Sequence, residues 1–239
     1  MRTCLLNTKD GEELVYNVTG TGRPVLLIHG VSMWSDMWTQ NGVAGKLGDW
    51  AKVIAPDLRG HGHSSRPHNP SSYGLKLVED QLQVLDAEAA ETVDVIGFSL
   101  GAEIALKLAT IAPSRVSSLF LIGTGWTRDD GMDRYREFAE WARENGAGMT
   151  PNPDYDAFDA LVDGMPEIIC LAQEKLEKIG VRCAGVVGGN DPHLPDLEAL
   201  VGVIPGFVLD KLVEVPHETS WRHLSIPERI QTFLDDVKS

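Results

Sequence analysis

The chain has 239 residues and a mass of 26.1 kDa, which is enough for one α/β domain with a large core but not for two comfortable domains. Its 21 basic and 35 acidic residues give a formal charge of -14. This charge argues against a nucleic-acid partner, because such binding depends on Lys and Arg that neutralise phosphates. Residues 1–13 lack the apolar core of a secretory signal and no window approaches the length of a membrane span, so we expect a cytoplasmic protein without membrane contact.

Cysteine and histidine spacing gives no sign of a disulfide framework or a metal site. Cys4, Cys170 and Cys183 are odd in number and lack CxxC spacing. His61 and His63 are two positions apart, but no third ligand follows at a recognisable spacing. We therefore expect three reduced thiols and no metal.

Apolar runs rich in β-branched residues predict strands at 24–29, 52–56, 93–98, 116–123, 181–188 and 211–216. Because the runs are nearly continuous rather than alternating, they indicate a parallel sheet that is buried on both faces. Apolar residues at steps of three and four predict helices between several of them, from Leu75 to Ala89 and from Ile104 to Ile111. The alternation predicts an α/β fold, with a mostly parallel central sheet and helices on both faces.

The segment from about 128 to 179 has helical patterning without a convincing strand, and Pro151, Pro153 and Gly164 interrupt it. An excursion of this length between two strands favours a small helical cap over the carboxyl edge of the sheet. We therefore predict one domain, 1–239, with a cap insertion at about 128–179.

The stretch VIGFSLG, residues 95–101, is a strand that enters a G-x-S-x-G motif just before an amphipathic helix. A sharp turn between strand and helix forces strained dihedrals on Ser99, and Gly97 and Gly101 leave room for it. The turn puts the Ser99 hydroxyl at a helix N-terminus, where the backbone N–H of Leu100 can donate to an oxyanion. In this setting we favour Ser99 as a nucleophile over a simple Gly/Ser turn.

The stretch LLIHG, residues 26–30, ends another strand, and here the chain resembles the α/β-hydrolase family. The resemblance implies that the residue after His-Gly, Val31, lends the second oxyanion N–H, and that His29 shapes the loop. DLRGHGHSS, residues 57–65, is similar to a further glycine-rich turn of that family, for which we favour a structural role. The resemblance covers the whole chain and is weakest in the cap.

The stretch GVVGGNDPH, residues 185–193, puts an acid directly after the predicted penultimate strand. The family resemblance gives Asp191 the role of the triad acid, which orients a histidine base. The alternative is an Asp-Pro turn, which is common where strands end. We assign His193 to the loop surface.

The catalytic histidine is the departure from the family pattern. That pattern closes with a strand, Pro-Gly-x-Gly-His and a later Pro, and without gaps its histidine falls on Ser220. His217 and His223 are each three residues away, a distance of about 10 Å along an extended chain, whereas proton transfer needs about 2.6 to 3.2 Å. We prefer His217, because it directly follows the last predicted strand.

Three interpretations stay open. In the first, the loop is rebuilt and His217 completes a triad with Ser99 and Asp191. In the second, the chain is an inactivated form in which Ser220, natural or engineered, replaces the base. In the third, the fold serves binding or a reaction without a histidine, as in a lyase or a receptor-like protein. We favour a serine hydrolase that acts on an ester, thioester or lactone without a cofactor. Tryptophans near the expected cleft suggest a small-molecule substrate with an apolar portion: Trp34, Trp38, Trp126, Trp141 and Trp221.

Overall fold

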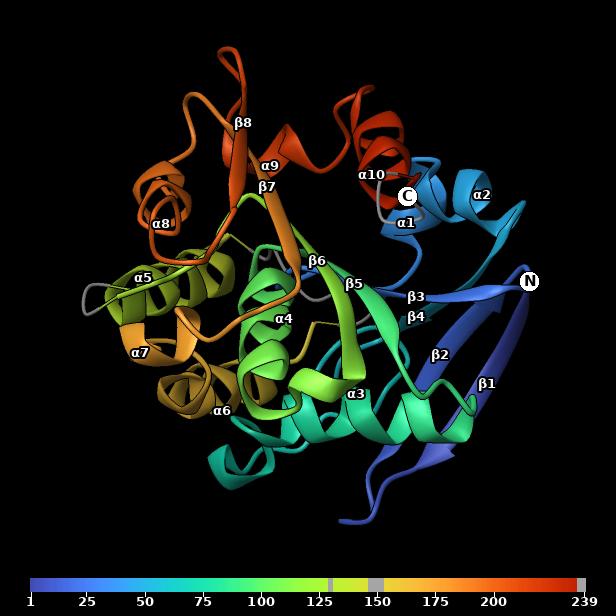
Figure 1. Cartoon of the computed structure of the whole chain (residues 1–239). Helices are drawn as coiled ribbons and strands as arrows, with labels where there is room; N and C mark the ends of the chain where they lie inside the picture. The colour runs from blue at the N-terminus through green and yellow to red at the C-terminus, as the bar shows by residue number, and fades with distance from the viewer. Residues whose placement is uncertain (129–130, 146–152, 236–239) are drawn as a thin grey trace.

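A computed structural model describes residues 1–128, 131–145 and 153–235, and Figure 1 shows one sheet with helices packed around it. Eight strands form the sheet in the order β1-β2-β4-β3-β5-β6-β7-β8. The strands β3 to β8 run parallel, whereas β1 and β2 are antiparallel to their neighbours. The predicted α/β fold with a mostly parallel sheet is therefore confirmed.

The strands have these bounds: β1 Arg2–Asn7, β2 Glu13–Thr19, β3 Arg23–Ile28, β4 Ala51–Pro56, β5 Val93–Phe98, β6 Val116–Ile122, β7 Arg182–Gly188 and β8 Val208–Leu212. The helices are α1 Met37–Gln40, α2 Val43–Gly48, α3 Lys76–Ala87, α4 Leu100–Ile111, α5 Gly131–Glu144, α6 Tyr155–Gly164, α7 Gln173–Leu176, α8 Leu194–Glu198, α9 His217–Ser220 and α10 Ile226–Asp235. Short 3₁₀ turns lie at η1 Pro70–Ser72, η2 Pro113–Arg115 and η3 Met165–Glu167.

Alternate residues of the central strands face two separate hydrophobic cores. Leu26 and Ile28 of β3 belong to the core under α3 and α4, whereas Val25 and Leu27 belong to the core under α1, α2 and α10. All four side chains are fully buried. This burial on both faces explains why β3 reads as a continuous apolar run. In Figure 1, α3 and α4 lie together on one side and α1, α2 and α10 on the other.

The helices of the cap segment, α5, α6 and α7, are inserted between β6 and β7. Their buried side chains, among them Tyr135, Ala139, Phe158 and Leu161, belong to the same core as α3 and α4. Residues 129–130 and 146–152 of the predicted cap lie outside the described residues. The described helices of the cap therefore pack as a continuation of one sheet face.

Two features of the sheet differ from the prediction. The antiparallel strands β1 and β2 were not predicted, because neither is a continuous apolar run and four of the six residues of β1 are exposed. The last strand was expected at 211–216, but β8 spans Val208–Leu212, and only Leu212 of it is buried. An edge strand of this kind carries no long apolar run, so the apolar pattern misplaced it.

Within the described residues, no helix is both long enough and apolar enough to span a bilayer.

Candidate active site

Ser99 lies on the sharp turn between β5 and α4, with φ 52° and ψ -122°. These dihedrals are costly for a residue with a side chain, so the surrounding structure must hold them. The flanking glycines make the turn possible: a Cβ on Gly97 would lie 2.3 Å from the carbonyl oxygen of Gly101, and one on Gly101 would lie 2.1 Å from that of Ile28. The strained turn between strand and helix that the sequence predicted, called the elbow below, is therefore present.

His217 and Asp191 complete a hydrogen-bonded row with Ser99. The Nε2 atom of His217 lies 3.0 Å from Oγ of Ser99, and its Nδ1 atom lies 2.8 Å from Oδ2 of Asp191. The Asp191 side chain is fully buried, whereas that of His217 is 16% exposed. Ser99, Asp191 and His217 follow β5, β7 and β8, and the carboxyl ends of these parallel strands share one edge of the sheet.

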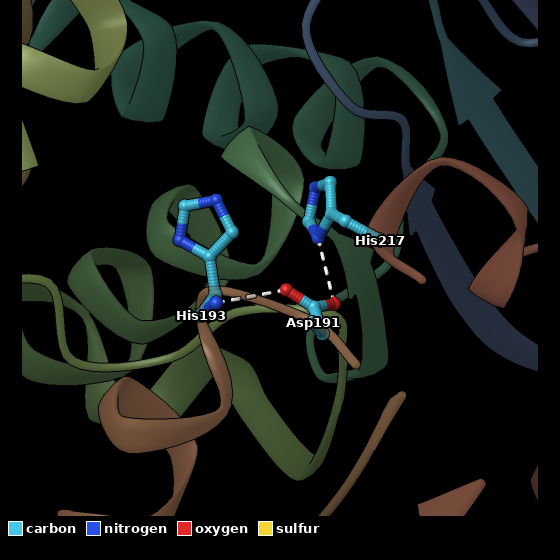
Figure 2. A group of neighbouring side chains, drawn as sticks. All are labelled: Asp191, His193 and His217. Carbon is cyan, nitrogen blue, oxygen red and sulfur yellow. Dashed lines mark hydrogen bonds and ion pairs between the residues drawn. The ribbon is translucent and has the colours of Figure 1, made fainter. Parts of the chain in front are cut away.

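The bonds of the Asp191 carboxylate decide which atoms of the row donate hydrogen bonds and which accept them. Oδ1 accepts the backbone N–H of His193 at 2.8 Å, so both carboxylate oxygens are engaged (Figure 2). A carboxylate can only accept, and therefore His217 must donate from Nδ1. In the neutral ring, the Nε2 lone pair then faces the Ser99 hydroxyl. This is the tautomer of His217 that a general base needs.

The ring of His217 is held by two further contacts. It stacks on Phe98 with ring centroids 5.2 Å apart and an interplanar angle of 25°. Behind it, a Cβ on Gly123 would lie 3.1 Å from Cε1 of His217, and Gly123 has φ +80°. Neither supporting residue was singled out from the sequence. Gly123, directly after the buried strand β6, was the available signal.

The loop after β3 packs against the turn that carries Ser99. A Cβ on Gly30 would lie 2.8 Å from Phe98 and 3.2 Å from Cβ of Ser99, so only glycine allows this approach. Val31 follows directly and lines the same cleft as Ser99. Leu100 is the first residue of α4, where backbone N–H groups have no partner within the helix. Both predicted oxyanion donors are thus carried by the segments that meet at Ser99.

A cleft of about 580 Å³ opens over the row. Its wall is mainly apolar and aromatic, with several charged side chains, and consists of Val31, Ser32, Met33, Phe98, Ser99, Arg134, Tyr135, Glu137, Phe138, Trp141, Pro192, His193, His217 and Glu218. Of the five tryptophans expected near the cleft, only Trp141 lines it. Trp38 is instead fully buried in the core under α2 and α10.

Comparison with known proteins gives a match to the alpha/beta hydrolase fold over residues 23–155. A 2-hydroxymuconate semialdehyde hydrolase of Pseudomonas putida is 37% identical over 259 aligned residues, covering 91% of this chain and 89% of the relative. The chain belongs to the alpha/beta hydrolase fold family. An esterase from Thermogutta terrifontis has the same fold, with a TM-score of 0.84, 22% identity and full coverage of both chains.

Other relatives match only in part. An uncharacterized protein of Mycobacterium tuberculosis is 37% identical over 130 residues, which is 54% of this chain but only 37% of the relative. The aligned part of the chain thus spans well under half the length of that relative.

The family's histidine position falls on Ser220 without gaps, but the residue beside Ser99 is His217, the histidine preferred from the sequence. Ser220 is fully buried at the end of α9, and its Oγ donates to the backbone carbonyl of His217 at 2.9 Å. The physical reason is that β8 ends at Leu212, four residues before Pro216, and the chain turns at Glu214 with φ 54°. His223 also lies outside the row, with Nδ1 2.8 Å from Oγ of Ser225.

We expect Ser220→His to give no gain in the turnover of a p-nitrophenyl ester. The site has no room for an imidazole, and overfilling a well-filled site costs about 1 to 3 kcal/mol. Ser220→Ala, the matched control, loses one hydrogen bond and about 1 kcal/mol. Urea unfolding and initial rates for both variants check this. A large gain in Ser220→His would instead show that the base is missing from the wild-type chain.

The histidines of the loops after β3 and β4 have structural contacts. His29 is fully buried, its Nε2 accepts the N–H of Leu58 at 2.9 Å, and its Nδ1 contacts the Gly30 carbonyl. Burial lowers the pKa of His29 to about 4 and that of His61 to about 3, so both rings are neutral. His61 lies against His29, with centroids 5.2 Å apart, whereas His63 is exposed. His61 and His63 thus lie in different environments, and neither belongs to the group of possible metal ligands found among the described residues.

The turn at 57–65 is tied down by Asp57 and Arg59. Asp57 accepts the backbone N–H groups of Ser35 and His63 at 2.8 and 2.9 Å. Arg59 is fully buried and forms ion pairs with Asp80 at 2.6 Å and Asp10 at 2.9 Å. The hydrogen bond from Arg59 lowers the pKa of Asp10 to about 2. These bonds anchor the loop next to the site without entering the cleft.

A buried acid on α4 was missed by the sequence analysis. Glu103 accepts hydrogen bonds from Tyr135 Oη at 2.5 Å and from Thr127 Oγ1, and Tyr135 lines the cleft. Burial raises the pKa of Glu103 to about 7. A lone acid within the apolar pattern of α4 was the available signal. Its bonds fasten the first turns of α5 to the helix that carries Ser99.

We expect Glu103→Gln to remove part of the pH dependence of stability. Because the folded-state pKa lies near 7 against an ordinary 4.5, the folded chain holds the proton that the unfolded chain releases. The free energy of unfolding therefore falls as pH rises from 4.5 to 7, by at most about 3 kcal/mol from this group. Urea unfolding at several pH values in that range should show that the free energy of unfolding changes less with pH in the variant. The same change with pH in both proteins would contradict the expectation.

Proposed function

We propose that this chain hydrolyses a carboxylic ester, thioester or lactone through an acyl-enzyme on Ser99. The observation that carries the proposal is the row Ser99, His217, Asp191, with 3.0 and 2.8 Å between the bonded atoms, at the base of an open cleft. It favours the first of the three interpretations of the sequence, a working triad built by a changed loop. Membership in the alpha/beta hydrolase fold family supports the same reaction class.

In the first half-reaction, Ser99 Oγ attacks the acyl carbon while its proton passes to Nε2 of His217. The charge that develops on the acyl oxygen is stabilised by the N–H groups of Val31 and Leu100. Asp191 stabilises the imidazolium. The imidazolium then gives its proton to the departing alkoxide or thiolate, which leaves the acyl group on Ser99.

In the second half-reaction, water attacks the acyl carbon and His217 accepts its proton. The tetrahedral intermediate collapses, the carboxylic acid leaves, and Ser99 regains its proton from His217. Phe98, Phe138 and Trp141 give the cleft an apolar wall, which suits a small substrate with an apolar acyl or alcohol portion.

A fluorophosphonate probe tests the nucleophile. We expect rapid labelling of the wild-type chain and none of Ser99→Ala, because only the activated hydroxyl attacks phosphorus. A p-nitrophenyl ester should give a burst of p-nitrophenol close to one equivalent of protein if deacylation is slow. A folded wild-type chain that neither reacts with the probe nor hydrolyses the ester would overturn the proposal in favour of a non-hydrolytic or binding role.

A further inference from the structure

A second histidine lies beside the proposed base. His193 is on the loop after β7, and its ring centroid is 4.6 Å from that of His217 at an interplanar angle of 48°. Both rings line the cleft. Figure 2 shows the two imidazoles next to each other above the carboxylate of Asp191. The proposed reaction uses only one of them.

The potential ligand atoms of Asp191, His193 and His217 all lie within 4.8 Å of one another. Two imidazoles and a carboxylate suit Zn²⁺, which binds nitrogen at about 2.0 to 2.1 Å and carboxylate oxygen at about 2.0 to 2.2 Å. In the tetrahedral geometry of Zn²⁺, ligand atoms on one ion are therefore about 3.4 Å apart. The distances here must shorten by up to about 1.4 Å, so the histidine rings must move when the ion binds.

The outer contacts of His193 match those of metal-binding histidines. Its Nδ1 lies 3.3 Å from Oδ2 of Asp196, a buried carboxylate that Arg134 also binds at 2.8 Å. A carboxylate on one ring nitrogen fixes the tautomer and leaves the other nitrogen as a ligand. Within the part of the chain that the structure describes, Nε2 of His193 has no assigned hydrogen-bond partner, and it is the ligand atom this arrangement leaves available.

The charge around the cleft also favours a divalent cation. Asp191 and Asp196 are buried and each contacts one of the two rings, and Glu137 and Glu218 are exposed residues of the cleft wall. Arg134 is the one Lys or Arg of the described cleft wall, and it is paired with Asp196. The chain as a whole carries a formal charge of -14.

We propose that Asp191, His193 and His217 form an inhibitory binding site for Zn²⁺ or a similar transition-metal ion. The ion needs a deprotonated nitrogen of His217. With Asp191 as a second ligand, the ion binds at Nδ1 of His217 and replaces the hydrogen bond between Nδ1 and Asp191. The ring then carries its proton on Nε2, which faces Ser99, so the proposed base is lost while the metal stays bound. Binding itself does not depend on the proposed function, whereas inhibition does.

Calorimetric titration of the full chain with ZnCl₂ tests the binding. We expect one site in the wild type, and in His193→Ala an affinity reduced by more than about 100-fold, because a ligand is lost. Asp196→Asn should weaken binding by about 10- to 100-fold, the usual cost of removing an outer partner. His68→Ala, which alters an exposed histidine paired with Asp154, is the matched control and should bind as the wild type does.

Fluorophosphonate labelling of Ser99 with and without ZnCl₂ tests the link to His217, with each variant compared with its own metal-free rate. The ion should slow labelling of the wild type and of His68→Ala, but not of His193→Ala. No binding in the wild type, equal binding in His193→Ala, or undiminished labelling of metal-loaded wild type would overturn the proposal. If metal-free protein does not label at all, the proposed function fails, and calorimetry still decides the metal site.

Discussion

Replacing His217 by alanine should lower the turnover of a p-nitrophenyl ester by about 10⁶-fold, the cost of losing the base of a comparable serine triad. His217 is the residue whose Nε2 faces Ser99, at 3.0 Å. No other side chain of the described residues is hydrogen-bonded to Ser99 Oγ, so without His217 the proton passes to water. KM should change much less, because the apolar wall of the cleft still binds the substrate. Initial rates over a range of ester concentrations separate the two effects.

His223→Ala is the matched control for this experiment. It also removes one histidine from the segment after β8, but its ring contacts Ser225 and not Ser99. We expect nearly wild-type turnover. Added imidazole should partly restore His217→Ala, because the lost ring leaves space next to Ser99 at the open cleft. A severe loss in His223→Ala with little change in His217→Ala would contradict the assignment of the base.

The sequence predicted the central strands and the elbow because their constraints are local. A strand buried on both faces must be apolar throughout, and β3, β5 and β6 were recognised within one residue of their observed bounds. The elbow needs glycine at two positions around Ser99, since any Cβ there would meet a backbone carbonyl. Such requirements appear directly in the order of residues.

The choice between His217 and Ser220 depended on contacts that local spacing does not contain. The chain after β8 lies across the end of β7: Gly189 N–H donates to Leu212 and Asn190 N–H to Val215. A Cβ on Gly188 would lie 1.9 Å from the Val215 carbonyl oxygen, so glycine is needed for this approach. These contacts bring the chain to the site three residues earlier than the family pattern does. The pair Gly188-Gly189 was the signal, but only Gly188 lies in the predicted strand 181–188 and neither glycine was given a role.

The neighbours of the row were also beyond the sequence analysis. His193 was assigned to the loop surface, yet its ring lies next to His217 and its backbone N–H holds Asp191. Glu103 and Tyr135 are 32 positions apart, and their hydrogen bond depends on how α5 docks on α4. No periodic pattern predicts the position of a cap helix relative to the sheet. Such contacts follow from tertiary packing alone.

Asp191→Asn should reduce turnover by about 10⁴-fold, because it changes the tautomer of His217 and leaves the fold of the site unchanged. The carboxylate accepts on both oxygens, from the His193 N–H and from Nδ1–H of His217. In the variant, the amide oxygen keeps the bond to the backbone N–H, because the amide NH₂ cannot accept it. The NH₂ group then donates to Nδ1 of His217, which moves the ring proton to Nε2. A protonated Nε2 cannot accept from Ser99, although every heavy atom stays in place.

The matched control is Asp196→Asn, a substitution of the same kind five residues further along the chain. Asp196 contacts His193 and Arg134 and is not a partner of His217, so turnover should fall far less. Thermal unfolding of both variants shows whether either loss reflects the fold. Equal losses in the two variants, or a loss below about tenfold in Asp191→Asn, would mean that Asp191 does not set the tautomer. The His193 N–H therefore matters to the test: because it binds the amide oxygen of the Asp191→Asn variant, the amide NH₂ group is the one that faces His217.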